Sequence, residues 1–533
     1  MVKHFILTFF FFINTADCMN PKAVDLHNQA ITLGLTAEPT SLNSAVASEL
    51  VSQLILNHIT EGLMTYNDKL ELVGGVAYKW HSTRDKVHFW LRPDTKWSDG
   101  SKVVAEDFIS AWQYALNPKT ASPYAFILYP IKNAEAINQG TKPLTTLGVE
   151  APNEFELIIH LEKPCPYFLS LTAFKTYRPI KSSWLEKWGI NYAQDTESIL
   201  SNGPFMLSKW TPQKRITLTK NPHYWQKEKI QLNKIDIPYI TNESRTLFNA
   251  FQDNQIATWF EPALDHNEIK LALKKQIPLK HFTSGKIHFM AFNHRANRIT
   301  ANQSLRLAIQ TIINAEEYSL KVRGQRAKPM YGLFPSWLDK QFKTKLYLDK
   351  KPNVHHKKAL EYLEQAKKEL NLKQLPSLSL LLVDSPTANI QAEYFQQLFK
   401  EKLGLTIKID KQILKHQHAK CLSGDFDLLL TLWSPDFNDP MTYAEIFASW
   451  NPNNYGRFHS KIYDQMLLNS QTIEDFATRG IVFAKMQEYL NKEAVFMPLY
   501  ENNIVYIMHP MLKNAFLNPI GDAFNFNYSY LQP

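Results

Sequence analysis

The sequence predicts a mixed α/β protein that is built from two or three domains. Its 533 residues exceed what one hydrophobic core usually supports, which is roughly 250–300 residues. Hydrophobic residues make up 44% of the chain and aromatic residues 13%, which indicates large buried surfaces or an aromatic-lined cleft and excludes a disordered protein. A strand–helix–strand pattern in the last third of the chain predicts a sheet with parallel strands.

The N-terminal residues have the pattern of a secretory signal. Two basic residues precede the apolar run Phe5–Ile13, and small and polar residues follow it. We expect residues 1–18 to be a signal peptide; the alternative is a buried N-terminal strand. Cys18 stands where a lipoprotein signal places its lipidated cysteine. No other stretch reaches the ~18 apolar residues of a membrane-spanning helix. We therefore expect an exported protein that is tethered to a membrane, if at all, by a lipid at Cys18.

Charge, motif content and cysteine content exclude several function classes. The net charge is +9, but Lys and Arg are spread along the chain with Asp and Glu between them, so no nucleic-acid partner is expected. The sequence contains no Gly-x-Ser-x-Gly, His-Glu-x-x-His, phosphate-binding loop or dinucleotide fingerprint. We therefore expect no enzyme, cofactor or metal site. Cys165 and Cys421 are too few for a disulfide framework; one bridge between them and two separate thiols are both open.

The clearest local unit is a strand, a helix and a second strand. The apolar run Leu378–Val383 lies just beyond a proline and suits a buried strand. Thr387–Leu403 has apolar residues at helical spacing, and Gly404 is expected to end this helix in the left-handed conformation. Leu405–Ile409 supplies the next strand. This order predicts a parallel pair of strands with helices packed on the sheet.

A further strand of this sheet ends beside a carboxylate. In Phe426–Trp433 the even-numbered side chains are expected on one face and the odd-numbered ones, Trp433 included, on the other. Asp436 follows among turn-forming residues. Ligands of open α/β sheets bind at the carboxyl ends of strands, so Asp436 either caps the turn or binds a ligand cation. Other expected elements are helices at Lys357–Leu370, Ala105–Leu116 and Asn302–Ile312, and strands at Val87–Leu91, Glu154–Leu161, Arg215–Thr219, Lys234–Ile240 and Lys286–Asn293.

Several motifs resemble one family of transport proteins. The stretch VHFWLRPDTKWSDGSKVVAEDFISAWQYALNPKTASPYA, at Val87–Ala125, resembles the signature region of the periplasmic oligopeptide-binding proteins of ABC importers, the family 5 extracytoplasmic solute-binding proteins. Within it, Trp97 is expected to anchor a core and Gly100 to form a turn with positive φ. The resemblance runs from about residue 30 to the C-terminus, with further matches in order at Thr36–Asn43, Leu247–Ala257, Arg306–Asn314, Pro329–Gly332 and Asn453–Leu467.

The resemblance implies a two-lobed fold of the class II binding-protein type, with an additional inserted domain and a ligand cleft between the lobes. Residues 19–50, 184–284 and 504–533 would form the first lobe, residues 51–183 the inserted domain, and residues 285–503 the second lobe with the strand–helix–strand unit. Such interleaving explains why no low-complexity linker divides the chain.

The resemblance also implies where a peptide binds. Asp436 would accept a salt bridge from the α-amino group of the ligand, with Trp433 and Ser434 beside it, because an ammonium buried in a closed cleft has to be paired. Glu38 would line the cleft, and Tyr124 would contact the ligand. The structural alternatives stay open: Asp436 as a turn cap, Glu38 as a surface residue and Tyr124 as a half-buried one. The ligand main chain would be held as an added β-strand.

The chain departs from the family at the far end of the ligand. Leu430 stands where the peptide binders carry an arginine that meets the ligand carboxylate. Lys321 and Arg323 keep positive charge near the motif at Pro329–Gly332, and Lys420 is a further candidate. Otherwise the ligand lacks an ordinary free C-terminus, as cell-wall muropeptides and modified peptides do.

The expected function is that of a monomeric periplasmic receptor, which captures oligopeptides and delivers them to an inner-membrane ABC permease. The alternative is a different cargo for the same fold: a muropeptide, a modified peptide, a metal chelate or a saccharide. A ligand without an amine would be indifferent to Asp436, which distinguishes these cargoes. A secreted hydrolase that uses Asp436 and Glu38 as paired carboxylates is an alternative from another class.

Overall fold

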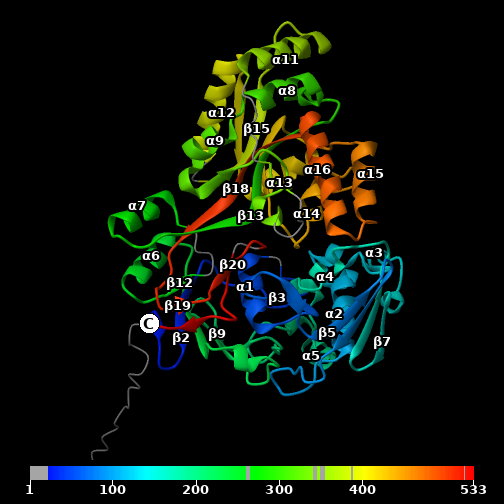
Figure 1. The fold of residues 1–533 in the computed structure, drawn as a ribbon, viewed down its shortest axis with the longest axis vertical. Helices are drawn as coiled ribbons and strands as arrows, with labels where there is room; N and C mark the ends of the chain where they lie inside the picture. Colours follow the sequence, from blue (N-terminus) through cyan, green and yellow to red (C-terminus); the bar gives the residue numbers. More distant parts are fainter. Residues whose placement is uncertain are drawn as a thin grey trace, which may run out of the picture.

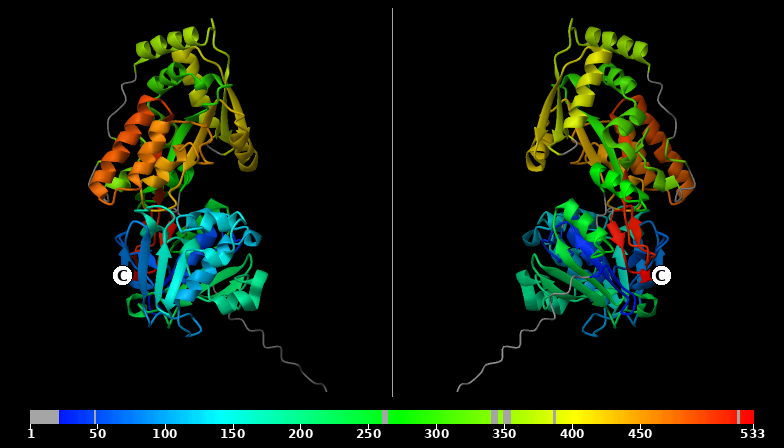
Figure 2. Two further views of the ribbon diagram at one scale, coloured as in Figure 1. Left: turned by 90° about the vertical axis from the view of Figure 1, so that its right-hand side faces the viewer. Right: turned by 90° about the vertical axis from the view of Figure 1, so that its left-hand side faces the viewer.

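The computed structural model of the protein contains a lower and an upper body (Figure 1), and Figure 2 shows the same division from both sides. Strands β13 (Lys280–Phe292) and β18 (Phe496–Tyr506) form an antiparallel pair that runs from one body into the other. The predicted signal peptide and Cys18 lie outside the described residues. The structure describes residues 22–47, 49–259, 264–339, 345–348, 355–385, 388–520 and 523–533.

A six-stranded sheet forms the core of the lower body. In it, β2 (Ala30–Leu35) lies between β11 (Lys234–Ile240) and β12 (Thr258–Trp259) and runs parallel to both. This central place explains why β2 is an almost uninterrupted apolar run. The sheet continues through β10 (Arg215–Lys220) to β9 (Phe205–Thr211), and β1, residues 24–25, pairs with the start of β2. Segments far apart in the sequence thus share one sheet, while the domain boundaries stay a prediction.

A second sheet of the lower body comes from the segment between β2 and β9. Its order is β5 (Ala77–Ser82), β6 (Lys86–Leu91), β8 (Glu156–His160) and β7 (Val149–Asn153), and all neighbours are antiparallel. The helix α2 (Ala105–Leu116), which was predicted with these bounds, contacts β7.

The signature motif serves the fold of this segment, as predicted. The indole of Trp97 is 1% exposed, and its Nε1 donates a hydrogen bond of 3.0 Å to Asp107 in the first turn of α2. Gly100 has a φ of +85° and forms the tight turn after Trp97. The motif therefore fixes the start of α2 and lies away from the pockets described below.

The upper body contains the predicted strand–helix–strand unit. β15 (Leu378–Val383) and β16 (Ile407–Gln412) are parallel and are connected by α12 (Ala388–Leu403). Gly404 ends this helix with a φ of +66°, as predicted. The whole sheet has the order β14 (Ala327–Pro329), β18, β13, β17 (Leu428–Trp433), β15 and β16. In it, β17 is parallel to β15 and antiparallel to β13.

The two faces of the upper sheet are covered by different helices. Leu428 and Leu430 pack in the cluster beneath α8 (Gln303–Ile312), α11 (His356–Glu369) and α12, whereas Leu429 packs in the other cluster with Phe447 and Phe496. The predicted alternation is therefore confirmed from Leu428 onwards, whereas it is wrong for Phe426, which precedes β17 and packs in the cluster of Leu429. On the second face lie α14 (Met441–Ala444), α15 (Lys461–Ser470) and α16 (Phe476–Lys492), at the right of the upper body in Figure 1.

Short elements complete the two bodies. The C-terminal residues return to the lower body, where the Leu531 amide donates to Gln29 Oε1 at 2.9 Å. The short elements are α1 (Leu50–Ile59), α3 (Ala134–Asn138), α4 (Phe168–Leu171), α5 (Ser182–Trp188), α6 (Ser244–Gln252), α7 (His266–Lys274), α9 (Ala315–Tyr318), α13 (Leu414–Ser423), β3 (Met64–Tyr66), β4 (Leu72–Gly74), β19 (Leu512–Lys513), β20 (Phe516–Asn518), β21 (Ala523–Asn525) and β22 (Tyr530–Leu531).

The ladder between β13 and β18 is interrupted where the strands pass between the bodies. Its register shifts between Thr283 and Ile287, and Gly285 lies inside this bulge. A Cβ atom on Gly285 would lie only 2.7 Å from Cγ of Pro435 and 2.8 Å from the carbonyl oxygen of Pro519. Glycine is therefore required for the close approach of the chain at this crossing.

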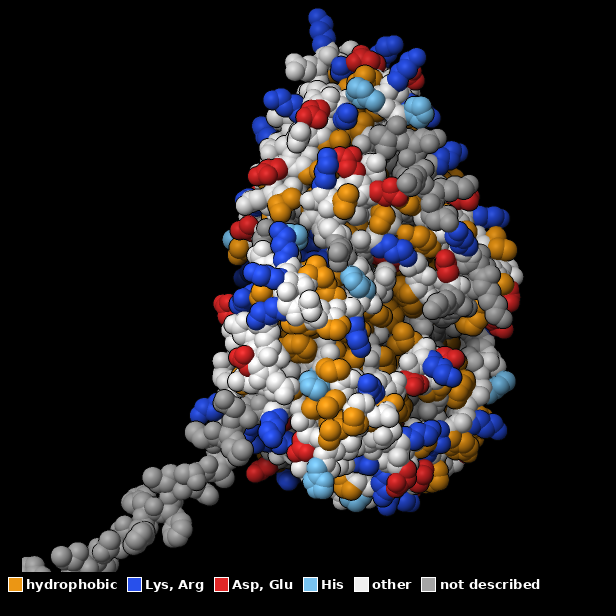
Figure 3. Space-filling model, turned by 60° about the vertical axis from the view of Figure 1, so that its left-hand side comes forward, with side chains coloured by type: hydrophobic (Ala, Val, Ile, Leu, Met, Phe, Trp, Pro, Cys, Tyr) orange, Lys and Arg blue, Asp and Glu red, His pale blue; other side chains and the backbone are white. Residues whose placement is uncertain are grey.

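The cysteines, the surface charge and the hydropathy of the helices bear on three further expectations. Cys165 and Cys421 are free thiols, so the possible bridge between them is wrong. Lys and Arg side chains are scattered over the face that Figure 3 shows, with Asp and Glu among them and apolar side chains gathered towards its middle. Within the described part of the chain, no helix is both long and apolar enough to cross a membrane.

Candidate ligand-binding site

A pocket lies where the upper body meets the lower body. Asp436 and Phe437 line it from the turn after β17, and the lower body supplies mainly polar side chains. Across the same junction, the ring of Tyr167 stacks on Phe437 with a centroid distance of 4.7 Å and an interplanar angle of 8°. The residues that line the pocket from the lower body include Asn57, Glu61, Lys175, Arg178, Asn525 and Asn527.

The turn that carries Asp436 is fixed by hydrogen bonds, but its carboxylate has no partner among the described residues. Its main-chain amide donates a hydrogen bond of 3.1 Å to Thr442 Oγ1, and Nε1 of Trp433 donates to the same oxygen at 3.4 Å. No hydrogen bond to the carboxylate itself is formed by the residues that the structure describes. Burial raises the pKa of Asp436 to about 6, and the nearby Lys175 ammonium opposes this rise. The turn is thus built around Thr442, which sequence reasoning missed.

Lys175 faces this carboxylate from the lower body. Its side chain is buried, and its ammonium lies 3.8 Å from the ring centroid of Tyr124 and 4.1 Å from that of Phe174. Burial lowers the pKa of Lys175 to about 7, against the effect of Asp436. Sequence reasoning missed this lysine, because in the sequence it is only a basic residue within a segment rich in aromatic side chains.

Tyr124 belongs to the same group of side chains. Burial and the charge of Asp436 raise its pKa to about 12. The structure therefore brings together Tyr124, Lys175 and Asp436, of which the first and third were predicted as ligand contacts. Ser434 is half-buried and lies two residues before Asp436 in the chain.

Glu38 lies in the lower body, against the hairpin of β9 and β10. Its two oxygens accept hydrogen bonds from Trp210 Nε1 at 2.5 Å and from the Gln213 amide at 3.0 Å, both in the hairpin of β9 and β10. It does not line the pocket of Asp436. The predicted contact of Glu38 with a ligand stays a prediction, and a pair of catalytic carboxylates formed with Asp436 is not favoured.

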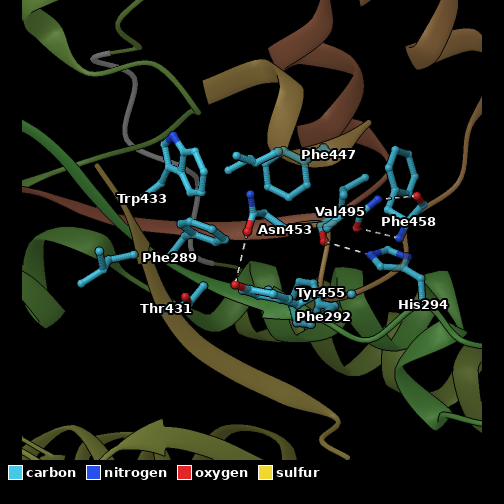
Figure 4. Close-up of a pocket in the computed structure, with 15 residues that line it drawn as sticks. Phe289, Phe292, His294, Thr431, Trp433, Phe447, Asn453, Tyr455, Phe458 and Val495 are labelled. Carbon is cyan, nitrogen blue, oxygen red and sulfur yellow. Dashed lines mark hydrogen bonds between the residues drawn. The ribbon is translucent and has the colours of Figure 1, made fainter. Parts of the chain in front are cut away.

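Trp433 borders a second, apolar pocket in the upper body (Figure 4). Phe289, Phe447 and Phe458 surround this pocket together with Trp433. Polar atoms at its wall are already bonded: His294 Nε2 lies 3.0 Å from the Val495 carbonyl oxygen, and the Tyr455 hydroxyl donates to Asn453 at 3.4 Å. The second pocket therefore suits an apolar group, whereas the pocket of Asp436 suits a charged one.

The candidate cations for the far end of a ligand differ in their surroundings. Lys321 is largely exposed and pairs with Glu317 at 2.6 Å. Lys420 pairs with two aspartates on the upper body, at 2.5 and 3.1 Å. Arg323 lies 5.5 Å from the ring centroid of Tyr500, and its buried Nε has no hydrogen-bond partner in the described part of the chain. Leu430 is 8% exposed within an apolar cluster. Arg323 is thus the candidate among these cations that has no ion-pair partner within the described residues.

A family model described as bacterial extracellular solute-binding proteins, family 5 Middle, matches residues 71–455. The chain belongs to this family. An oligopeptide-binding protein OppA of Bacillus subtilis is a family 5 relative that is 31% identical over 93% of this chain and 91% of its own length.

Solved structures of family 5 proteins have the same fold. The Escherichia coli murein tripeptide binding protein MppA superposes with a TM-score of 0.76 at 27% identity, covering 96% of this chain and 99% of that one. Listeria monocytogenes OppA, in a structure described as bound to peptide, gives a TM-score of 0.74 at 26% identity and covers 95% of this chain and 99% of its own. The predicted two-lobed α/β fold is therefore confirmed.

Proposed function

We infer that this protein is a solute-binding protein that captures oligopeptides in the pocket between its bodies and delivers them to an ABC permease. The observation that carries this function is the half-buried carboxylate of Asp436, which accepts no hydrogen bond from the residues that the structure describes. Family membership and the similarity to oligopeptide-binding proteins support it.

The geometry suggests how a peptide is held. The α-ammonium of the peptide forms a charge-assisted hydrogen bond with Asp436, and it thereby offsets the free energy that burial of the carboxylate costs. The peptide main chain pairs as an added strand, which gives affinity with little dependence on side-chain identity. A side chain of the peptide enters the apolar pocket at Trp433, and Arg323 receives the terminal carboxylate.

Other cargoes fit these observations less well. A saccharide or a metal chelate without an amine would leave the Asp436 carboxylate unpaired in a closed pocket. A muropeptide or a modified peptide has an amine and remains the main alternative; the similarity to the murein tripeptide binding protein favours it over the other two. A hydrolase is disfavoured because both oxygens of Glu38 are already bonded within the lower body.

The location follows from the family and from the N-terminal sequence. We propose that the protein acts as a monomer in the periplasm, after removal of the signal peptide predicted at residues 1–18. Attachment to a membrane by a lipid would instead require cleavage before Cys18, so that this cysteine stays on the mature chain.

Native mass spectrometry of protein purified without denaturation tests the function. A series of short-peptide masses in the bound fraction is expected, and it would report the preferred peptide length. Synthetic peptides should also raise the melting temperature of protein from which bound ligand has been removed. A single non-peptide mass, together with no stabilisation by any peptide, would contradict the proposal.

A further inference from the structure

The pocket between the bodies contains two cations that recognition of a peptide amine does not use. Lys175 is 1% exposed and Arg178 is 7% exposed, and both line the pocket together with Asp436. They lie three residues apart in one short segment of the lower body, at the turn Lys175–Tyr177. A buried cation without a direct partner is unfavourable, so its presence in a pocket calls for a ligand.

The ammonium of Lys175 has no hydrogen-bond partner among the residues that the structure describes. The ring faces of Tyr124 and Phe174 lie near it, but cation–π contacts stabilise a desolvated ammonium less than a carboxylate at hydrogen-bond distance does. Among the neighbouring charges, Asp436 acts most strongly on the Lys175 cation, followed by the like charge of Arg178 and then by Glu49; neither of these two carboxylates forms an ion pair with Lys175. The donors of Lys175 are therefore free for an acidic group.

Arg178 is better compensated than Lys175. Its Nη1 donates to Thr60 Oγ1 at 2.9 Å and its Nη2 to Asn57 Oδ1 at 2.5 Å, whereas its buried Nε has no partner in the described part of the chain. Glu61, which is 5% exposed, balances the charge of Arg178, and its own oxygens accept hydrogen bonds from Tyr224 at 2.6 Å and from a neighbouring indole. Among the described charged residues of this pocket, Lys175 and Asp436 are left without a hydrogen bond to their charged groups.

This charge arrangement restricts the ligand. A peptide ammonium at Asp436 would use the carboxylate that now stabilises Lys175, and the closed pocket would then hold an excess of positive charge. The ligand removes this excess if it brings an anion together with its amine; without one, Lys175, whose burial lowers its pKa to about 7, would have to release its proton. We propose that Lys175, with Arg178 behind it, binds an acidic side chain on the first residue of the peptide, so that the pocket selects peptides that begin with Asp or Glu. The inference rests on the proposed function.

Isosteric peptides provide the direct test. Peptides of three to five residues that begin with either Asp or Asn and continue in Ala have the same size and differ by one charge. Calorimetry on the full chain, freed of bound ligand, should give a Kd at least about tenfold lower for the Asp series. Equal affinity for the two series, or tighter binding of the Asn series, overturns the inference and leaves the proposed function intact. Failure of both series to bind overturns both.

Two lysine variants test whether Lys175 causes the preference for peptides that begin with Asp. In Lys175→Met the ratio of the two Kd values should fall to about one, because the Asp series loses its partner and the Asn series does not. In the matched control Lys373→Met, which removes an exposed lysine of the upper body, the ratio should stay as in the parent protein. A preference that persists in Lys175→Met would show that another group is responsible. If this variant does not fold, the comparison of peptides on the parent protein still decides.

Discussion

Replacing Asp436 by Asn removes one charge from the pocket between the bodies and keeps the shape of the side chain. Burial raises the pKa of Asp436 from 3.8 to about 6, which corresponds to roughly 3 kcal/mol against the ionised form, less what solvent screening removes at its partly exposed surface. A peptide ammonium that pairs with the ionised carboxylate offsets this cost when the peptide binds. In the variant the ammonium is left buried and unpaired, so binding should weaken by ~3 kcal/mol, which is about a hundredfold or more in Kd.

Calorimetry at pH 7 measures this effect with two controls. Asp384→Asn removes an exposed carboxylate of the upper body and should leave the Kd unchanged. An N-acetylated peptide lacks the ammonium, so it should bind the parent protein as weakly as the free peptide binds Asp436→Asn, and the two changes together should cost little more than either alone. If Asp436→Asn binds the free peptide within about threefold of the parent, the ion pair does not exist.

The pH dependence of binding follows from the same carboxyl group. Peptide affinity should fall as the pH is lowered through about 6, since protonation of Asp436 removes the partner of the ammonium, and Asp436→Asn should lack this decrease. The stability of the ligand-free protein depends on pH in the opposite direction. Because folding raises the pKa of Asp436 from 3.8, its contribution to stability is greatest below pH 4 and is lost as the pH rises to about 6. Denaturant titrations between pH 4 and 6.5 test this.

Three further substitutions test other contacts. Tyr167→Ala removes the ring stacked on Phe437 across the two bodies; such a pair contributes ~0.5–1.5 kcal/mol, so the peptide Kd should rise about two- to tenfold. Arg479→Met breaks a buried pair with Asp439, in which the side chains are 0% and 1% exposed, and should lower the free energy of unfolding in urea by ~3–5 kcal/mol. Gly100→Ala places a side chain at a φ of +85° and should cost ~1–2 kcal/mol in the same assay.

Each of these has a control or a contradicting result. Tyr167→Phe keeps the stacked ring and should bind peptide like the parent. Glu364→Gln removes an exposed ion pair with Lys367 and should change stability by less than ~1 kcal/mol, in contrast to Arg479→Met. Unchanged stability of Gly100→Ala would contradict the left-handed conformation assigned to that turn.

The sequence predicts those helices and strands whose formation depends on residues close together in the chain. Leu378–Val383 is an apolar run with a proline before it and a helix after it, and Gly404 stops that helix, so the unit was predicted to within a few residues. The strand β13 was expected from Lys286 but begins at Lys280. Its first residues are polar and end in glycine, and they are extended because they pair with β18 at the crossing between the bodies.

The candidate site was predicted only in part, because some of its side chains are positioned by residues remote in the chain. Asp436 stands out because it follows a strand end, and that position is visible in the sequence. Lys175 does not stand out, because its burial depends on Tyr124 and on Asp436, which are remote in the chain. Glu38 matched a family motif, but contacts with the hairpin of β9 and β10 place it away from this pocket. Motifs identify neighbours in sequence, whereas the charge balance of a pocket depends on neighbours in space.

The bulge at Gly285 has a consequence for the kinetics of ligand exchange. It lies in the strand that carries the chain between the bodies. A Cβ atom at Gly285 would lie 2.7 Å from Pro435, which precedes Asp436, and the Gly285 carbonyl oxygen accepts a hydrogen bond of 2.6 Å from Tyr443. Bending the crossing strands at this break in the ladder must therefore displace the turn that holds the carboxylate. We therefore expect separation of the bodies and loss of the peptide amine to be coupled, so that opening limits the rate of peptide dissociation.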